Sequence, residues 1–325
     1  MSAPTTGRAL VGVSACLLGE EVRYDGDHKL DGFISGPLAQ AVELRPVCPE
    51  VDIGLGVPRE PIKLARRGDD LRLVASESGT DLTAAMRSYA EAKVQELDAA
   101  GICGYVLKSR SPSCGLGSVP IDGAEIGDGL FAAALSKLCE LLPLVEETGL
   151  NGNDSREVFL ARVLAYRRLR DLFDGEWTIT ELVEHHTRQE LLLMAQSPEL
   201  YSELGRLVAD AAGRDPDEVE SFYRHLTMKA FREKVDAGQH STALSHMQGY
   251  LRDRAPGEDY GELERKIGLF CDGEGSLAGV LDDFRHLVKK HSVDYLAEQV
   301  YLEPQPIELL ELKDNQEDSP DAAQG

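Results

Sequence analysis

The chain of 325 residues contains no apolar run that approaches the roughly 20 residues a membrane-spanning helix needs. Its first residues also lack the basic start and long apolar stretch of a secretory signal. We therefore expect a cytoplasmic protein that does not enter a membrane. At this length the chain has room for two domains of roughly 100 to 200 residues each.

Cysteine is scarce and scattered. The six cysteines are too widely spaced for the disulfide framework of a small secreted domain, and no CxxC pair of the kind that holds structural zinc is present. Cys103 falls within an apolar strand pattern and Cys139 on the apolar side of a helix pattern, so both are expected in the core. The cysteines that need another explanation are Cys16, Cys48 and Cys114, because each follows a strand pattern and enters a polar loop.

Basic residues are fewer than acidic residues in this chain. The chain has 34 Lys and Arg residues against 57 Asp and Glu residues, which gives a formal net charge of -23. Such a chain repels polyanions at long range, so its composition argues against nonspecific nucleic-acid binding. Part of the excess lies in residues 313–325, which are acidic and poor in apolar residues and are predicted to form a disordered tail.

Residues 1–150 alternate strand and helix patterns, which predicts an α/β domain with a mostly parallel sheet. IKLARRGDDLRLV alternates apolar and polar residues around a Gly-Asp turn and predicts a hairpin. From residue 151 to 312 the strand patterns disappear, and an all-α domain is predicted. Its expected helices cover 155–173, 178–196, 198–212, 216–235, 241–254, 260–270, 276–290 and 292–301.

The three loop cysteines stand at strand ends, and the carboxyl ends of parallel strands meet at one edge of a sheet, where ligands bind. Thiolates are soft ligands that favour zinc, copper(I) or iron-sulfur clusters. Three thiolates without a fourth suit a 4Fe-4S cluster with one iron left open. From spacing alone, the same three residues could equally be unrelated small hydrophobic side chains.

The segments VSACLLGEEVRYDG, RPVCPEVDIGLGVPREP and LKSRSPSCG resemble the signature stretches of TudS-type thiouracil desulfurases, and the resemblance spans residues 8–146. The remainder, including AYRRLRDLF and SHMQGYLRD, resembles a YbgA-like helical domain. This two-part arrangement is similar to that of the RudS desulfidases, which act on 4-thiouridine. The resemblance implies a 4Fe-4S cluster held by Cys16, Cys48 and Cys114.

Glu50 is the best-placed carboxylate to activate a water molecule, because it lies two residues beyond Cys48 in the same loop. Its alternative role is a helix cap or a salt bridge. Ser111 and Ser113 flank Pro112 beside Cys114, and one of them is expected to be catalytic by donating to the substrate ring or relaying a proton. The sequence does not choose between the two serines.

Four further polar residues lie in the same stretches and are expected to bind the substrate: Ser14, Asp25, Lys108 and Ser109. Each could instead organise its own loop, and Asp25 in particular could serve only to stabilise the turn in RYDG.

The helical domain concentrates positive charge on one helix, at Arg162, Arg167, Arg168 and Arg170. Further basic residues follow at Lys229, Arg232, Lys234, Lys289 and Lys290. Since basic side chains contact phosphates, this surface is expected to dock tRNA or a nucleotide.

The sequence therefore predicts an iron-sulfur desulfidase that acts on a 4-thiouracil-type base, nucleoside, nucleotide or tRNA. The products are a uracil-type base and sulfide. Two other readings stay open: a different hydrolyase or dehydratase that uses an open-site cluster, and a noncatalytic iron-sulfur sensor whose helical domain binds a partner.

Overall fold

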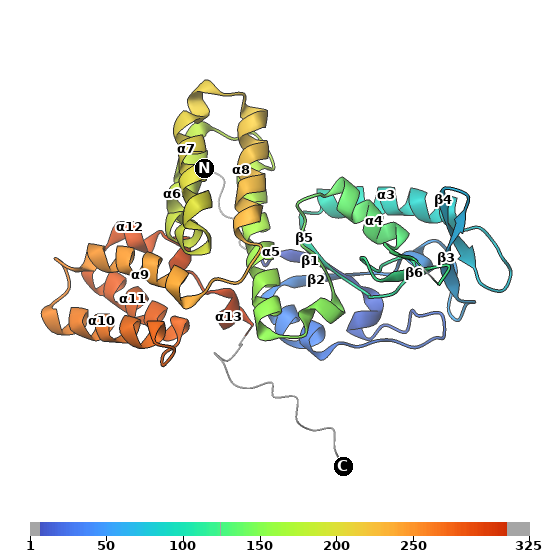
Figure 1. Cartoon of the computed structure of the whole chain (residues 1–325), viewed down its shortest axis with the longest axis horizontal. Helices are drawn as coiled ribbons and strands as arrows, with labels where there is room; N and C mark the ends of the chain where they lie inside the picture. The colour runs from blue at the N-terminus through green and yellow to red at the C-terminus, as the bar shows by residue number, and fades with distance from the viewer. Residues whose placement is uncertain (1–6, 124, 311–325) are drawn as a thin grey trace, which may run out of the picture. The chain divides into compact units, whose positions relative to one another are not determined.

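The strand patterns of the N-terminal half form two sheets in a computed structural model that describes residues 7–123 and 125–310 (Figure 1). The first, sheet A, is parallel throughout, with the strand order β2-β1-β5-β8. Every residue of β1 and of β5 is buried, as is typical of central strands covered on both faces. The strands of sheet A are β1 Leu10–Ser14, β2 Glu43–Val47, β5 Ile102–Leu107 and β8 Leu144–Glu146.

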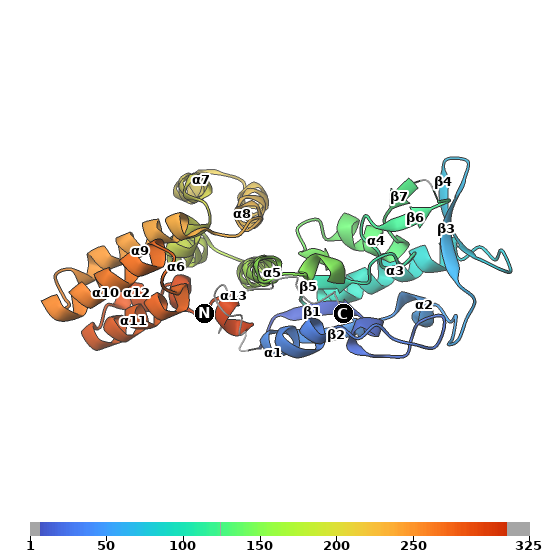
Figure 2. The same ribbon diagram turned by 60° about the horizontal axis from the view of Figure 1, so that its bottom comes forward.

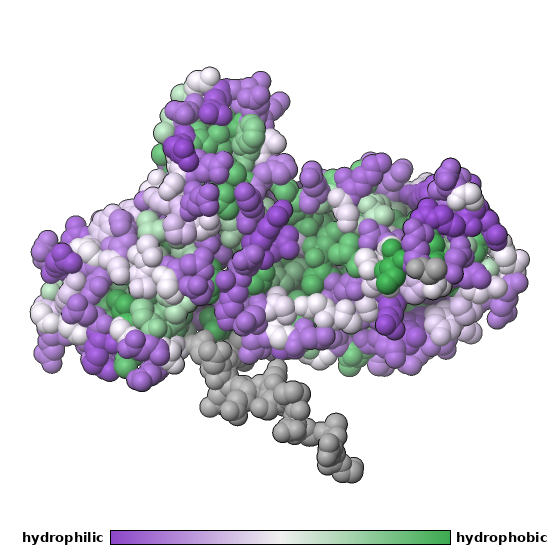
Figure 3. All heavy atoms as spheres, in the orientation of Figure 1, coloured by the Kyte–Doolittle hydropathy of each residue, from purple (hydrophilic) through white to green (hydrophobic). Residues whose placement is uncertain are grey.

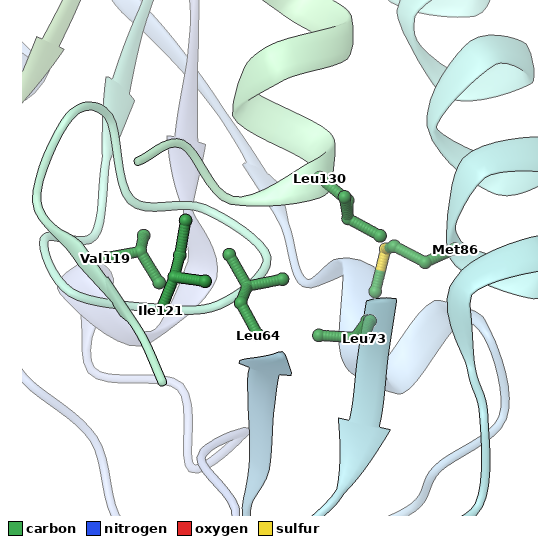
Figure 4. Packing of buried hydrophobic residues seen from close by; sticks show 6 residues of the cluster. All are labelled: Leu64, Leu73, Met86, Val119, Ile121 and Leu130. Carbon is green, nitrogen blue, oxygen red and sulfur yellow. The ribbon is translucent and has the colours of Figure 1, made fainter. Parts of the chain in front are cut away.

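The second sheet, sheet B, has the order β4-β3-β6-β7. The predicted hairpin is confirmed as the antiparallel pair β3 Ile62–Arg67 and β4 Asp70–Ala75, seen beside β6 in Figure 2. Strand β6 Val119–Ile121 joins β3 in parallel, and β7 Glu125–Gly127 closes the sheet in the antiparallel sense. The sequence did not separate this sheet from sheet A. Its apolar face packs in one cluster, shown in Figure 4: Leu64, Leu73, Met86, Val119, Ile121 and Leu130.

Helix α3 Thr83–Ala99 buries Met86, Ala90, Val94 and Leu97, which recur every three or four residues on one face. It packs beside α4 Leu130–Leu138. The shorter helices of this half are α1 Ala39–Ala41 and α2 Pro49–Asp52. Cys103 and Cys139 are buried, which confirms their predicted place in the core.

The C-terminal half is mostly helical, as predicted. Its first helix after the change of pattern is α5 Asn153–Phe173, and α6 begins with a capping box in which Thr178 and Glu181 bond each other's backbone N–H groups. Prolines at the first helical position start α7 and α8. The remaining helices are α6 Ile179–Gln196, α7 Pro198–Asp210, α8 Pro216–Ala230, α9 Ala237–Leu251, α10 Gly257–Cys271, α11 Leu277–His291, α12 Asp294–Ala297 and α13 Pro306–Leu309.

One predicted helix is much shorter than expected. Of residues 292–301, only Asp294–Ala297 are α-helical, and a 3-10 turn follows at Val300–Leu302. The buried Gln299 interrupts the helix with an extended backbone, and its side-chain amide donates to the carbonyl of Thr187 at 2.9 Å. A tertiary hydrogen bond therefore overrides the helical pattern.

The chain divides into two compact units, Met1–Phe159 and Leu160–Gly325, and the division falls within α5. The predicted domain boundary at residue 150 lies just before this helix. The predicted acidic tail, residues 313–325, lies outside the described residues. In the part of the chain that the structure describes, no helix is long and apolar enough to cross a membrane. Hydrophilic residues cover most of the face shown in Figure 3.

Candidate active site

Three strand ends meet at one edge of sheet A. Strand β1 lies between β2 and β5 and pairs in parallel with both. Cys16 lies in the 3-10 turn that follows β1, Cys48 comes directly after β2, and Cys114 lies in the loop that follows β5. Because parallel neighbours end at the same edge, the strand order brings together loops that are 32 and 66 residues apart in the sequence.

The three cysteine thiols lie close to one another, and two of them are buried. Cys16 is 8% exposed and Cys114 is 5% exposed, while Cys48 is half-buried, and none of them forms a disulfide. Burial raises the pKa of Cys16 to about 11, and the charge of Cys48 adds to this shift. Burial also raises the pKa of Cys114 far above its usual range; a hydrogen bond from Ser14 opposes the shift, while Cys48 and Cys16 add to it. A thiolate at one cysteine therefore disfavours ionisation of the others unless a cationic group binds beside them.

Within the described residues, no group of three or more His, Cys, Asp or Glu side chains is arranged so that it could hold a metal ion. Three soft sulfur ligands from different loops suit an iron-sulfur cluster, and Lys108, Arg23 and Arg59 lie near enough to lower the pKa of Cys16 or Cys48 and so favour thiolates.

The loop that carries Cys114 is anchored to α4 through its backbone. The carbonyl of Ser113 accepts hydrogen bonds from the N–H groups of Phe131 at 2.9 Å and Ala132 at 3.2 Å. Gly129 precedes α4 and lies directly against the same peptide, because a Cβ atom there would be 2.4 Å from the Ser113 carbonyl oxygen and 2.9 Å from the Cys114 nitrogen. The close approach of the two backbones requires glycine at this position.

We expect Gly129→Ala to lower the free energy of unfolding by about 1–3 kcal/mol, because the new methyl group must push the Ser113–Cys114 peptide away from α4. Urea unfolding of the apoprotein measures the change. Gly36→Ala is the matched control, since a Cβ atom at Gly36 meets nothing within 4 Å. Equal stability of Gly129→Ala and the original chain would contradict this account of the loop.

Glu50 lies in the first turn of α2, and its side chain is only 14% exposed. Its Oε2 atom accepts two hydrogen bonds from Arg59, from Nη2 at 2.6 Å and from Nε at 3.1 Å. Its Oε1 atom accepts from the hydroxyl of Ser113 at 3.1 Å and from that of Ser111 at 3.4 Å. The structure therefore brings the predicted acid and both predicted serines together, and it also gives Glu50 a salt bridge.

The two serines differ in their surroundings. Ser111 is partly exposed, and its Oγ atom accepts hydrogen bonds from the N–H groups of Cys114 at 3.1 Å and Ser113 at 3.3 Å. This hydroxyl therefore holds the turn that presents Cys114. Ser113 is fully buried, and its hydroxyl donates to Glu50.

Lys108 and Ser109 are held by Glu147, which follows β8. The ammonium group of Lys108 forms an ion pair with Glu147, and the N–H and hydroxyl groups of Ser109 donate to the same carboxylate at 2.7 Å each. Burial opposes ionisation of Glu147, but the bonds from Lys108 and Ser109 keep the pKa of this carboxyl below its usual range. Ser14 connects this group to the cysteines, because its hydroxyl accepts from the Lys108 N–H at 3.0 Å and hydrogen-bonds Cys114.

Asp25 occupies a different position from the other predicted site residues. It forms an ion pair with Arg23 at 3.3 Å and accepts from the N–H of Asp27 at 3.3 Å. Among the described residues, no hydrogen bond or ion pair joins it to Glu50, the serines or the cysteines. These contacts match the turn-stabilising alternative.

Two important residues were not identified from the sequence. Arg59 stands within the quoted stretch RPVCPEVDIGLGVPREP, but its pairing with Glu50 across nine positions has no local signal. Glu147 could have been proposed as a site residue from the sequence. It follows the last parallel strand, and the end of that strand must lie at the same edge of the sheet as the cysteines.

Comparison with known proteins identifies two regions. Residues 11–147 match the family described as 2-thiouracil desulfurase. Residues 190–306 match a family described as a protein of unknown function (DUF1722).

The individual relatives each match less than half of this chain. The uncharacterized protein YbbK of Bacillus subtilis (strain 168) is 34% identical over 139 residues, which represent 38% of this chain and 88% of YbbK. The uncharacterized protein YbgA of Escherichia coli (strain K12) is 27% identical over 148 residues, 45% of this chain and 88% of YbgA. The solved structure of the 4Fe-4S-dependent thiouracil desulfidase TudS is 35% identical, covers 44% of this chain and 93% of its own, and has a TM-score of 0.38.

Proposed function

The chain belongs to the 2-thiouracil desulfurase family, and from this membership we propose that it removes the sulfur of a 4-thiouracil-type base as sulfide. The observation that carries the proposal is the convergence of three cysteines, one carboxylate and two hydroxyls at the carboxyl edge of sheet A. The proposed substrates are 4-thiouracil, 4-thiouridine, its nucleotides and thiolated tRNA.

Cys16, Cys48 and Cys114 are the proposed ligands of a 4Fe-4S cluster. The donor set supports this cofactor, because the three soft sulfur atoms lie close enough to one another to interact electrostatically. When bound, such a cluster supplies an iron without a protein ligand, which acts as a Lewis acid on a thione sulfur. Cations at Lys108, Arg23 and Arg59 support the thiolate form of the ligands.

The reaction replaces sulfur by oxygen without net oxidation or reduction. Water adds its oxygen to the thiocarbonyl carbon, the carbon–sulfur bond breaks, and the sulfur leaves with the two protons of water as hydrogen sulfide. Glu50 Oε1 is the proposed proton acceptor for the water, since Oε2 is occupied by Arg59. Ser113, which donates to the same Oε1, is the better placed of the two serines to pass a proton between Glu50 and the base.

The residues around Glu147 are proposed to orient the substrate. Lys108 and Ser109 are each fixed by that carboxylate, so their polar groups hold one position and cost little entropy when a base binds. Ser14 contributes by fixing the Lys108 backbone beside Cys114. For Asp25 we propose only an indirect role, through its ion pair with Arg23.

The function is tested by anaerobic reconstitution of the full chain with iron and sulfide, followed by incubation with 4-thiouridine. Production of uridine and one equivalent of sulfide supports the desulfidase. A reconstituted cluster that releases no sulfide from the base, nucleoside, nucleotide or tRNA rejects it. Turnover of a hydroxylated substrate instead would favour the hydrolyase or dehydratase, and cluster loss that changes only partner binding would favour the sensor.

A contact between the helical unit and tRNA is a separate part of the proposal. Several arginines of α5 have acidic partners: Arg167 pairs with Asp171 at 3.6 Å, Arg168 with Glu303 at 3.2 Å and Arg170 with Asp174 at 2.6 Å. These pairs reduce the positive charge that the sequence suggested for this helix.

Arg162 and Arg232 differ from these pairs. The Nε atom of Arg162 is buried without a hydrogen-bond partner, and burial together with the charge of Arg232 lowers the pKa of its guanidinium. Among residues 7–123 and 125–310, neither arginine has an acidic partner within ion-pair distance. A phosphate group would relieve this repulsion, so we place the proposed tRNA contact at these two residues.

The double variant Arg162→Gln and Arg232→Gln is expected to weaken binding of thiolated tRNA and to reduce the slope of log Kd against log salt concentration by about 2, one for each lost phosphate contact. Fluorescence anisotropy measures both quantities. Arg265→Gln serves as the control, because Arg265 is exposed and paired with Glu262. Unchanged affinity and salt dependence in the double variant would argue against this surface.

A further inference from the structure

The guanidinium group of Arg59 is held in a single orientation. Nη2 donates to the Val22 carbonyl at 2.8 Å as well as to Glu50, and Nη1 donates to the Gly56 carbonyl at 2.8 Å. The Arg59 side chain is 6% exposed, so its bonds to Val22 and Glu50, which are partly buried, have little competition from bulk water.

The pairing of Arg59 with Glu50 is unusual in one respect. An arginine fork commonly spans both oxygens of a carboxylate, with one N–H group on each. Here Nε and Nη2 both donate to Oε2 of Glu50, which leaves Oε1 to the hydroxyls of Ser113 and Ser111. The two oxygens of Glu50 therefore have different surroundings, and Arg59 determines which one faces the loop of Cys114.

Arg59 also links the three cysteine loops. The Val22 carbonyl lies in the segment that follows Cys16, and it accepts from the Cys48 thiol at 3.8 Å as well as from Arg59. Glu50 follows Cys48, and its Oε1 atom meets the loop of Cys114. One guanidinium group thus connects the loops that leave β1, β2 and β5.

We infer that Arg59 is a positioning residue that orients Glu50 for water activation by fixing Oε2 and directing Oε1 toward the site of reaction. This inference rests on the proposed function, because it assigns Arg59 its role through Glu50. A lysine at this position retains the charge and can pair with the carboxylate. It cannot bond Oε2, Val22 and Gly56 with the geometry of the planar fork.

Arg59→Lys is compared with Arg66→Lys after anaerobic reconstitution of the full chain. Arg66 is a matched control, because it also makes two bonds to a glutamate, Glu125, at 2.7 Å and 3.1 Å, but is 43% exposed. For Arg59→Lys we expect iron content equal to that of the original chain, kcat with 4-thiouridine about 10²-fold lower and KM changed less than about threefold. Arg66→Lys should change none of these.

A crystal structure of Arg59→Lys provides the readout that does not depend on activity. We expect Glu50 Oε1 to leave hydrogen-bond distance of the Ser113 hydroxyl, which is 3.1 Å in the original chain. Loss of iron in proportion to activity would assign Arg59 a structural role and overturn the inference, as would an unchanged kcat. If Arg59→Lys does not fold, the same measurements on Arg59→Gln decide the question.

The two proposals fail in different ways. If the original chain releases no sulfide, the proposed function is wrong. The orientation of Glu50 in the variant crystal then decides the positioning role alone: a displaced carboxylate supports it, and an unmoved one overturns it.

Discussion

Replacing Glu50 by glutamine is expected to reduce kcat for sulfide release about 10²- to 10⁴-fold while iron content stays unchanged, because the amide cannot accept a proton from water. Glutamine has nearly the same shape as glutamate and can still accept a hydrogen bond from Arg59. The cluster loops should therefore keep their positions. Steady-state kinetics with 4-thiouridine measure kcat. Iron analysis and the visible absorbance of the cluster measure how much cluster is bound.

Glu50→Ala should also abolish turnover, but it is a less selective test. Removal of the carboxylate leaves the guanidinium group of Arg59 buried without its counter-charge, and breaking a buried pair in this way costs about 3–5 kcal/mol.

Glu125→Gln is the control for Glu50→Gln, since Glu125 forms an exposed pair with Arg66. Normal sulfide release by Glu50→Gln would remove Glu50 from the mechanism.

Cys114→Ser is expected to eliminate bound iron and all desulfidase activity. A serine hydroxyl is a harder ligand with a far higher pKa than a thiol, so it does not replace a soft thiolate on iron. Cys114 is buried at 5% exposure, and its N–H group donates to the Ser111 hydroxyl, which holds the residue in place. Reconstitution should bind about four iron atoms per original chain and close to none per variant chain.

Cys103→Ala separates the effect of the ligand from that of a disturbed core. Cys103 is 3% exposed within β5, the strand that precedes the loop of Cys114, and its loss creates a small cavity. We expect this variant to be less stable and to retain its full iron content and activity. Iron binding by Cys114→Ser equal to that of Cys103→Ala would refute the assignment of Cys114 as a ligand.

Much of the N-terminal fold could be predicted because its signals are local. The buried run ICGYVL and the helical spacing of Met86, Ala90 and Val94 specify their elements through short-range patterns. The division of the strands into two sheets could not be predicted, because β6 and β7 are only three residues long and β6 joins β3, a strand that is distant in the sequence. The shortened helix near Gln299 has the same cause, a contact between distant segments.

The sequence alone determined which chemistry is available in this protein: three cysteines that each follow a strand, a glutamate two residues beyond one of them and two serines beside another. The tertiary structure decided how these groups act together. The order β2-β1-β5 brings the strand ends to one edge, and Arg59 and Glu147 fix the groups found there. The physical reason is that residue type is encoded locally, whereas the partner of a buried charge depends on which distant loop the fold places against it.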